Sequence, residues 1–433
     1  MIDILSTFFK KVTPAAAICL SVMTGTPVMA DEAKPFNPLD PINEPIKDIG
    51  KFGLDLRLGY EWNDSDIEGK DTAKALSLRS RLSFKSVDFA GFSAFLQLQN
   101  NWNLVDDFYS PNGYGDTSHS VIADPPGTRL HQGYIDYKGI EDTTIRIGYQ
   151  EIIFDDARLI GNVGWRNNAQ SFSALRVTNK SIDDLTLDLV YASEIHNIFN
   201  NDDLDLNHLI MAHADYKFSD AVNAAAFAYL LDSEGDSRDS GTYGLRLYGK
   251  NEGFSYDTTL ATQRDYADGK DHNGWFFSGD VKQKLGKVTA GLGYQYISGG
   301  EGTDKFDTLF GTAHKFNGWA DQFLGTGSPS ALPGGLQDMY ATLGTKLGGT
   351  KFTTAYHLYH TAESTGAFSG WYGQEFNIVA ARKLTDNLTL LLKYAIYDEM
   401  QSEPTYDDAK KAFVDANPTF DEQVFWVRLN LTY

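Results

Sequence analysis

Apolar and polar side chains alternate residue by residue along this chain. In FGLDLRLGYEW, residues 52–62, every second residue is leucine or aromatic, and glycine or a charged residue stands between them. The C-terminal stretch VFWVRLNLTY, residues 424–433, places Phe425 and Tyr433 on one face and Arg428 on the other. Successive side chains of an extended strand point to opposite faces, so each segment predicts a strand with one apolar and one polar face.

About eighteen such segments lie between residues 52 and 433, each near the length that a tilted strand needs to cross a bilayer. Short turns such as 86–91 and 284–287 alternate with long, polar, glycine- and aspartate-rich loops such as 103–128, 151–169 and 299–335. Transmembrane barrels have tight periplasmic turns and long external loops. We therefore predict an all-β fold: an antiparallel transmembrane β-barrel of about 18 strands, of the outer-membrane type, with its apolar face toward lipid and its polar face toward a lumen.

A soluble β-sandwich or propeller is the alternative fold. Its connections would not sort by length, and it would usually show blade or Greek-key repeats, which the sequence lacks. Aromatic residues also gather at segment ends, as the interfacial girdles of a barrel require. They are Tyr60, Trp62, Trp102, Tyr137, Tyr149, Tyr191, Tyr294, Tyr296 and Tyr397. Eighteen strands enclose more room than side chains fill, so an aqueous passage is expected.

The N-terminal region reads as processing and leader sequence. Residues 1–30 carry Lys10 and Lys11, a short apolar stretch and small residues before Asp31, which predicts a cleavable signal peptide. Residues 31–51 contain four prolines and no periodicity, so we expect an extended, Pro-rich periplasmic leader. Residues 52–433 then form the barrel with long extracellular loops. The expected location is the outer membrane of a Gram-negative bacterium.

The net charge of the chain limits the classes of partner that it can bind. The net charge is -21, and the predicted signal peptide contains two lysines and one aspartate, so its removal leaves a still more acidic protein. Nucleic acid is therefore not an expected partner. No motif implies a cofactor or metal, and none is predicted. Outer-membrane lipid is the expected partner of the apolar face.

The inward face predicts the chemistry of the lumen. Mixed rings of charge in a narrow pore select solutes, and the planar fork of arginine suits carboxylates. The alternative is a set of salt bridges that only brace the wall. The inward candidates for solute binding include Arg57, Arg79, Arg81, Arg146, Arg246 and Glu375.

Three stretches resemble the outer-membrane alginate export family. They are ADPPGTRLHQGYIDY (123–137), RIGYQEIIFDDARLIGNVGWRNNAQSFSALRV (146–177) and LFGTAHKFNGWADQFL (309–324). The resemblance implies an eighteen-stranded monomeric barrel that exports an acidic exopolysaccharide through an arginine-rich constriction gated by loops. Periplasmic polymer-delivery proteins are a further partner class, which the sequence leaves open. Tyr433 resembles the terminal aromatic that assembly machinery recognises in such barrels.

The resemblance also assigns residues. Arg79 and Arg81, together with Arg129, Arg146, Arg158 and Arg166, become candidates for contact with the polysaccharide. In the third stretch, His314, Lys315, Trp319 and Asp321 are expected to shape an inward-folded gating loop. The alternative for that segment is an ordinary external loop held by aromatic packing.

Three classes of function compete. The first is passive export of an alginate-like acidic polysaccharide, and the second is a substrate-selective porin importing small acids, sugars or aromatic compounds. The acidity of the chain leaves open whether its acids lie in external loops or whether the substrate differs from alginate. The third class is a membrane enzyme, which needs a nucleophile beside a base. No G-x-S-x-G signature occurs, so no enzyme is predicted.

Overall fold

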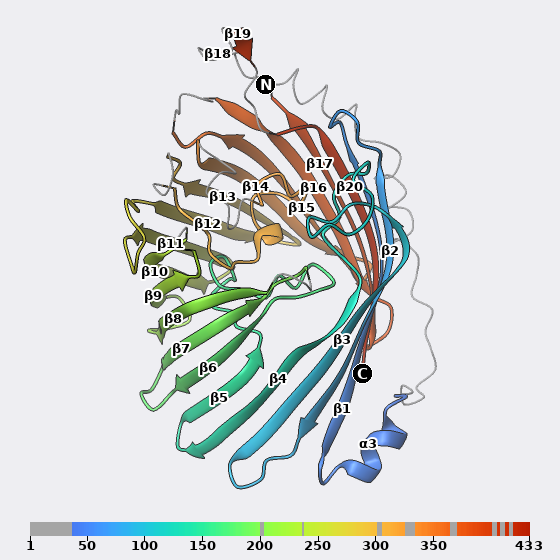
Figure 1. The fold of residues 1–433 in the computed structure, drawn as a ribbon, viewed down its shortest axis with the longest axis vertical. Helices are drawn as coiled ribbons and strands as arrows, with labels where there is room; N and C mark the ends of the chain where they lie inside the picture. The colour runs from blue at the N-terminus through green and yellow to red at the C-terminus, as the bar shows by residue number, and fades with distance from the viewer. Residues whose placement is uncertain are drawn as a thin grey trace.

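The computed structural model describes residues 37–199, 203–235, 238–300, 305–324, 334–363, 370–400, 405–407, 412–414 and 419–433. The predicted signal peptide lies outside these residues. Eighteen strands form one antiparallel sheet, which closes because β1 (Gly50–Ser65) pairs with both β2 (Ala73–Ser86) and β20 (Glu422–Thr432) (Figure 1). A closed sheet has no unpaired edge, which backbone chemistry requires in lipid. The predicted 18-stranded antiparallel barrel is confirmed.

The remaining elements follow one another around the barrel. The strands are β3 (Phe92–Asp107), β4 (Gly127–Ile140), β5 (Thr143–Gln150), β6 (Ser171–Asn179), β7 (Leu185–His196), β8 (Leu204–Lys217), β9 (Asn223–Ser233), β10 (Ser240–Asn251), β11 (Phe254–Arg264), β12 (Trp275–Leu285), β13 (Val288–Ile297), β14 (Leu336–Leu347), β15 (Thr350–His360), β16 (Trp371–Lys383) and β17 (Leu388–Glu399). A separate two-stranded ribbon joins β18 (Thr405–Asp407) and β19 (Ala412–Val414). The helical elements are α3 (Asp40–Ile46) and the 3-10 turn η1 (Ala313–Lys315).

Connections sort by length as predicted. At one end the strands are joined by 87–91, 141–142, 180–184, 218–222, 252–253, 286–287, 348–349 and 384–387. The opposite end carries the long connections, among them 108–126, 151–170 and 298–335. The short turns mark the periplasmic end, and Figure 1 shows α3 at that end. Among the described residues, no helix is long and apolar enough to cross a membrane.

The outer face of the sheet is apolar. Ile147, Leu245 and Leu292 are 58%, 64% and 65% exposed, and residues beside them in the chain point the other way. Arg146 and Arg246, for example, pair inside with Asp136 and Asp257. Large exposed aliphatic side chains around a closed barrel form the band that meets hydrocarbon. The chain is therefore an outer-membrane barrel.

The leader differs in part from its expected extended form. Residues 40–46 form α3, with Pro41 in the first turn, where its missing N–H leaves no bond unmade. The side chain of Asn43 ties this helix to β1. Its Nδ2 donates to the carbonyl of Phe52 at 3.1 Å and its Oδ1 accepts from the N–H of Phe52 at 2.7 Å. The first strand begins at Gly50, two residues before the predicted start.

The inner face is not uniformly polar, in contrast to the alternation that predicted a wet lumen wall. On β9, Phe227, Tyr229 and Leu231 point inward and are buried. Tyr397, expected in an interfacial girdle, is also buried inside, against Phe323. These side chains are apolar because loops from the extracellular end fold inward and cover them.

Two loops fold into the lumen, and we name them the first inner loop (residues 151–170) and the second inner loop (residues 305–324). They pair through a parallel bridge between Ile160 and Phe310, and the N–H of Phe310 donates to the carbonyl of Leu159 at 3.0 Å. Figure 1 shows η1, part of the second inner loop, inside the barrel. Phe154, Leu159, Ile160 and Phe310 share one buried cluster with Phe227 and Tyr229 of the wall. Inward folding of residues 314–321 is thus observed.

Candidate functional site

Four arginines lie together on the lumen face of three neighbouring strands. Register places Arg57 of β1 opposite Arg79 of β2, and Arg81 opposite Asp55. Arg428 of β20 stands opposite Gly59, one inward position further along β1. Three adjacent strands thus bring four guanidinium groups to one side of the lumen, and we name this set the arginine cluster.

Two of the four guanidinium groups of the arginine cluster have a carboxylate within 4.0 Å among the described residues. Arg79 pairs with Asp55, and Arg81 lies 3.8 Å from Glu151 while its Nε donates to Gln99 at 2.7 Å. Within the described part of the chain, Arg57 and Arg428 lie within 4.0 Å of no carboxylate. Their hydrogen-bond partners are neutral and do not cancel their charges.

The tip of the first inner loop occupies these two arginines. Arg57 Nη1 donates to the carbonyls of Trp165 at 3.0 Å and of Arg166 at 3.3 Å. Arg428 Nη1 donates to the carbonyl of Trp165 at 2.6 Å, and its guanidinium carbon lies 3.6 Å from the centre of the Trp165 ring. Guanidinium groups stack on aromatic faces through the ring quadrupole. The loop tip therefore docks on the arginine cluster by contacts that involve no opposite charge.

Lys393 of β17 extends this docking surface. Its Nζ lies 3.9 Å from the centre of the Trp165 ring and 4.0 Å from that of Trp319. The imidazole of His314 stacks on Trp165 at 4.5 Å between centroids. Both inner loops thus meet the same wall through cation–aromatic contacts.

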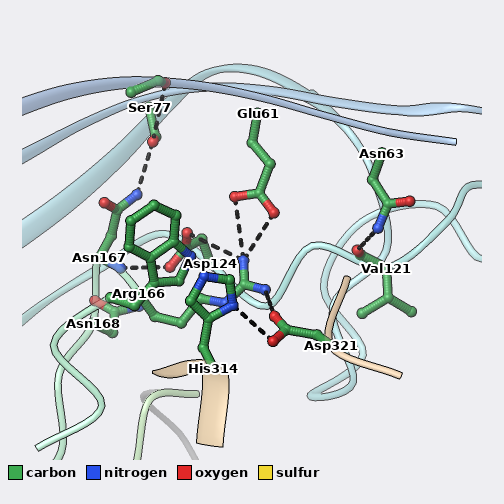
Figure 2. Close-up of polar contacts among 12 residues, drawn as sticks. Glu61, Asn63, Ser77, Val121, Asp124, Arg166, Asn167, Asn168, His314 and Asp321 are labelled. Carbon is green, nitrogen blue, oxygen red and sulfur yellow. Dashed lines mark hydrogen bonds and ion pairs between the residues drawn. The ribbon is translucent and has the colours of Figure 1, made fainter. Parts of the chain in front are cut away.

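Arg166 sits at the centre of a buried ion network (Figure 2). Its Nη1 donates to Glu61 Oε1 at 3.0 Å, its Nη2 donates to Asp321 Oδ2 at 2.8 Å, and Asp124 lies 3.9 Å away. Burial lowers the pKa of Arg166, but the carboxylates more than offset this, so its pKa lies above the ordinary value. The network joins β1, both inner loops and the loop at 108–126.

His314 and Asp321 link the network to Lys393. Burial lowers the pKa of His314 to about 3, so the imidazole is neutral. Its Nδ1 donates to Asp321 Oδ1 at 2.7 Å, which leaves Nε2 to accept from Lys393 Nζ at 2.6 Å. Burial raises the pKa of Asp321, but His314 and the charges of Arg166 and Lys393 outweigh it and hold that pKa below its ordinary value. This carboxylate therefore stays ionised at neutral pH.

Glu375 of β16 anchors the second inner loop. Its buried carboxylate accepts hydrogen bonds from the backbone N–H groups of Trp319 and Ala320, the latter at 3.0 Å. Gly318 has a φ of 86°, and a Cβ there would collide with the Glu375 carboxylate. Glycine at this position permits both the left-handed turn and the close approach.

The other predicted site residues lie apart from the arginine cluster. Arg158 is buried, donates to Asn317 Oδ1 at 2.7 Å and lies over Phe316. Lys315 donates to the carbonyl of Asp156 at 2.6 Å. Arg129 donates to the carbonyls of Asn197, at 2.5 Å, and Ala169. These three side chains contact loop segments rather than open lumen.

Arg146 and Arg246 belong to ladders elsewhere on the inner wall. Arg146 forms a two-point pair with Asp136, at 2.6 and 2.9 Å. Arg246 pairs with Asp257 and with Asp155 of the first inner loop, at 2.8 and 3.1 Å. Such cross-strand pairs solvate and brace the wall, and they leave little free charge.

The sequence-based choice of site residues omitted three that the geometry brings in. Arg428 and Lys393 were recognisable as inward positions by alternation, but nothing in the pattern indicated their shared contact. Trp165 stands in GNVGWRNN, a segment without periodicity, so its place between two cations had no sequence signal. Among the described residues, one group has metal-compatible spacing, Glu194, His196 and Asp203, and it lies outside this site.

Comparison with solved structures shows the fold. The chain resembles OccAB4 of Acinetobacter baumannii (13% identity, TM-score 0.65, 88% of this chain and 97% of that one). It also resembles OccK9 (OpdG) of Pseudomonas aeruginosa, with 16% identity, a TM-score of 0.66, and 90% of this chain and 99% of that one covered. A third similar structure is OpdK of Pseudomonas aeruginosa with vanillate, which has 14% identity and a TM-score of 0.63, with 89% of this chain and 99% of that one covered. No curated protein is significantly similar to this chain in sequence.

The family is shown by sequence. The model of the family described as alginate export matches residues 49–399, which span β1 to β17 and both inner loops. Together with the closed sheet and its apolar outer band, this match identifies an outer-membrane channel protein. The chain belongs to the alginate export family.

Proposed function

We propose that the channel lets an acidic, alginate-like exopolysaccharide diffuse passively out of the cell. The observation that carries this proposal is the pair Arg57 and Arg428, which lie within 4.0 Å of no carboxylate among the described residues and stand beside Arg79 and Arg81 on the inner face of the wall. Uronate carboxylates are the natural partners of such guanidinium groups, since charge-assisted bonds are roughly twice as strong as neutral ones.

The docked loop supports a coupling between binding and opening. Carbonyl groups of Trp165 and Arg166 occupy donors that a uronate would use. A polymer carboxylate arriving at the arginine cluster therefore competes with the first inner loop for the same N–H groups. The polymer would displace the loop tip, so the solute that fits the cluster is also the one that opens the passage.

The acidity of the chain is compatible with this substrate. Asp66, Asp71, Asp107 and Asp116 stand in connections or strand ends at the extracellular rim, away from the arginine cluster. We further propose that one chain makes a complete pore, because its sheet closes on itself. Periplasmic proteins would deliver the polymer to the end that carries α3.

Polymer block in planar bilayers tests the proposal. A polyuronate added on the periplasmic side should interrupt the current, and a neutral polysaccharide of the same length should not. The double variant Arg57→Gln/Arg428→Gln should weaken the block about tenfold or more, while Lys287→Gln, in the short turn at 286–287, should leave it unchanged. Equal block by the neutral polymer would refute an anionic substrate.

One observation favours the second candidate, a porin that imports small acids. A cavity of about 510 Å³ lies among the inner loops and is lined by Arg166, Arg238, Phe199 and Phe310. Its size and its mixture of cations and rings suit a small aromatic acid better than a polymer. Saturable uptake of such an acid, without any polyuronate block, would support this candidate over export.

A further inference from the structure

A polar cluster lies on the outside of the barrel, at the extracellular end of β6 and β7. Ser173 Oγ is 2.8 Å from His196 Nε2, and His196 Nδ1 is 2.9 Å from Asp203 Oδ2. The Ser173 hydroxyl also donates to Glu194 Oε2 at 3.0 Å, and that carboxylate lies 3.4 Å from His196 Nε2. The ring of Tyr149 meets the imidazole edge-on at 4.5 Å. A hydroxyl, an imidazole and a carboxylate in this order form a nucleophile–base–orienting relay.

The cluster faces away from the channel. Ser173 pairs across the sheet with Tyr149 and with Glu194, and both of these also point outward. The neighbours Phe172 and Ile195 point inward and belong to the buried cluster under the inner loops. The sheet therefore separates Ser173 from the arginine cluster, and the proposed export does not use it.

An apolar groove on the outer wall ends at this cluster. Its volume is about 890 Å³, and Leu96, Ile147 and Leu175, all exposed, are among its lining residues. The groove follows a row of cross-strand partners through β1 to β6, and because barrel strands tilt, this row climbs toward the extracellular end. The row is Phe52, Phe84, Leu96, Gly133, Tyr149 and Ser173. Gly133 has no side chain to interrupt the groove where it crosses β4.

A β-bulge distorts the sheet at the same place. Ser173 pairs with Glu194 and Ala174 pairs with Ala192, so Ser193 is the extra residue, and it has no partner on β8 either. Ser193 also lines the groove. Bulges free one residue from the ladder and often occur next to active sites. Ser193 thus stands outside the ladder, next to Glu194 in the chain and at the end of the groove.

We propose that Ser173, His196 and Asp203 form a catalytic triad that hydrolyses ester bonds of outer-leaflet lipids whose acyl chain lies in this groove. Ser173 Oγ attacks the ester carbonyl while His196 Nε2 takes its proton. The carbon–oxygen bond to the alcohol breaks, and His196 returns the proton to the leaving alkoxide. Water then cleaves the acyl-enzyme by the same steps, giving a free acid. Glu194 and Asp203 stabilise the transient imidazolium.

The geometry favours this relay over a metal centre built from the same side chains. Asp203 contacts Nδ1 of His196, whereas Glu194 lies beside Nε2. One ligand atom from each of the three residues lies within 4.8 Å of the others, so a metal ion is the alternative occupant that the experiment below must exclude. The hydroxyl of Ser173 also stands where an ion at Nε2 would sit.

The test uses the full mature chain, refolded in detergent and in phosphatidylethanolamine vesicles. A fluorophosphonate probe should label Ser173, as located by peptide mass spectrometry. Hydrolysis of p-nitrophenyl laurate should fall about 100-fold or more in Ser173→Ala and in His196→Asn. Asp203→Asn should lower it at least tenfold. Ser181→Ala, a serine in a short periplasmic turn, should change neither readout.

Conductance shows that each variant is folded, since the outward cluster does not touch the channel. A wild-type protein that conducts but neither takes the label nor hydrolyses the ester overturns the proposal. Hydrolysis that persists in Ser173→Ala overturns it as well. Zinc binding that depends on His196 and Glu194, in protein without label at Ser173, would assign the cluster to a metal instead.

Discussion

The two sides of the lumen hold the inner loops by different physics. On the side of β7 to β9, the loops share a dry cluster with the wall, built from side chains such as Phe227, Tyr229 and Phe310. On the side of β17, β20 and β1, they rest on Lys393, Arg428 and Arg57 through carbonyl and ring contacts, beside a second apolar cluster in which Phe323 packs against Tyr397. Exposing a buried apolar side chain to water costs free energy. A cation, in contrast, can exchange a loop carbonyl for a solute carboxylate with little change in free energy. Both sides therefore hold the loops, and the donors of the charged side are the place where a solute can compete with the loop carbonyls.

The largest effect should come from breaking the apolar side. Phe310→Ala removes a ring that contacts Phe172 and Arg238 in the buried cluster. Loss of a buried phenylalanine costs about 3–5 kcal/mol. We expect a loss of this size in the free energy of unfolding, measured by urea titration in vesicles, together with noisier and larger single-channel currents. Leu292→Ala, on the lipid face, is the matched control and should leave the currents unchanged.

Removing the cation at the centre of the ion network should come next. Arg166→Leu leaves Glu61, Asp124 and Asp321 buried together without their shared partner, which costs about 3–5 kcal/mol when one member of a buried pair is lost. Addition of Glu61→Gln should recover part of this loss, because it removes one uncompensated charge. Hydrogen exchange of the inner-loop amides measures both the loss of stability in Arg166→Leu and its partial recovery in the double variant. Equal protection in wild type and Arg166→Leu would mean that the network does not hold the loops.

A backbone change at Gly318 should have a smaller effect. Its φ of 86° and the Glu375 carboxylate in the path of a Cβ make alanine both strained and crowded there. We expect Gly318→Ala to destabilise the second inner loop by about 1–3 kcal/mol. Gly69 has a similar φ of 80° but open space around it, so Gly69→Ala reports the strain alone. Equal losses of stability in the two variants would show that crowding against Glu375 does not contribute.

Acid should weaken the contacts of the inner loops with the charged side of the lumen and leave their apolar contacts unchanged. The pKa of Asp321 lies below its ordinary value, so its stabilising contribution is complete above about pH 4 and disappears as pH falls through the lowered pKa. His314, with a pKa of about 3, begins to take up protons in the same acid range. Loop exchange rates should therefore rise below about pH 4. Asp321→Asn should abolish most of this dependence, and an unchanged profile in that variant would contradict it.

Sequence reasoning reached the barrel and its faces but not the contacts inside it. Alternation shows which face of the sheet a strand residue points to, so Arg57, Arg81 and Arg428 were recognisable as inward residues. It does not show how deeply a residue is buried. Arg158 and Arg166 lie in a loop without periodicity, and only the pairing of the two inner loops explains why both are buried. The apolar inner face of β9 escaped prediction for the same reason, since its covering comes from residues about 70 to 80 positions away.

Ser173 and His196 show the same limit on the opposite wall. Each stands in an ordinary strand segment, and no local signature joins them. Only the register of β6 with β7, shifted by the bulge at Ser193, brings the hydroxyl to the imidazole. A catalytic arrangement of this kind is a property of strand pairing, which the spacing of residues in one segment does not contain.

The reversal potential of the open channel under a salt gradient tests the central claim most directly. With potassium chloride at low ionic strength, where charges are least screened, we predict that the wild-type channel prefers anions and that Arg57→Gln/Arg428→Gln loses most of that preference while still conducting. A wild-type channel that prefers cations, or a double variant with unchanged anion preference, would contradict the view that the charged side of the lumen selects the solute.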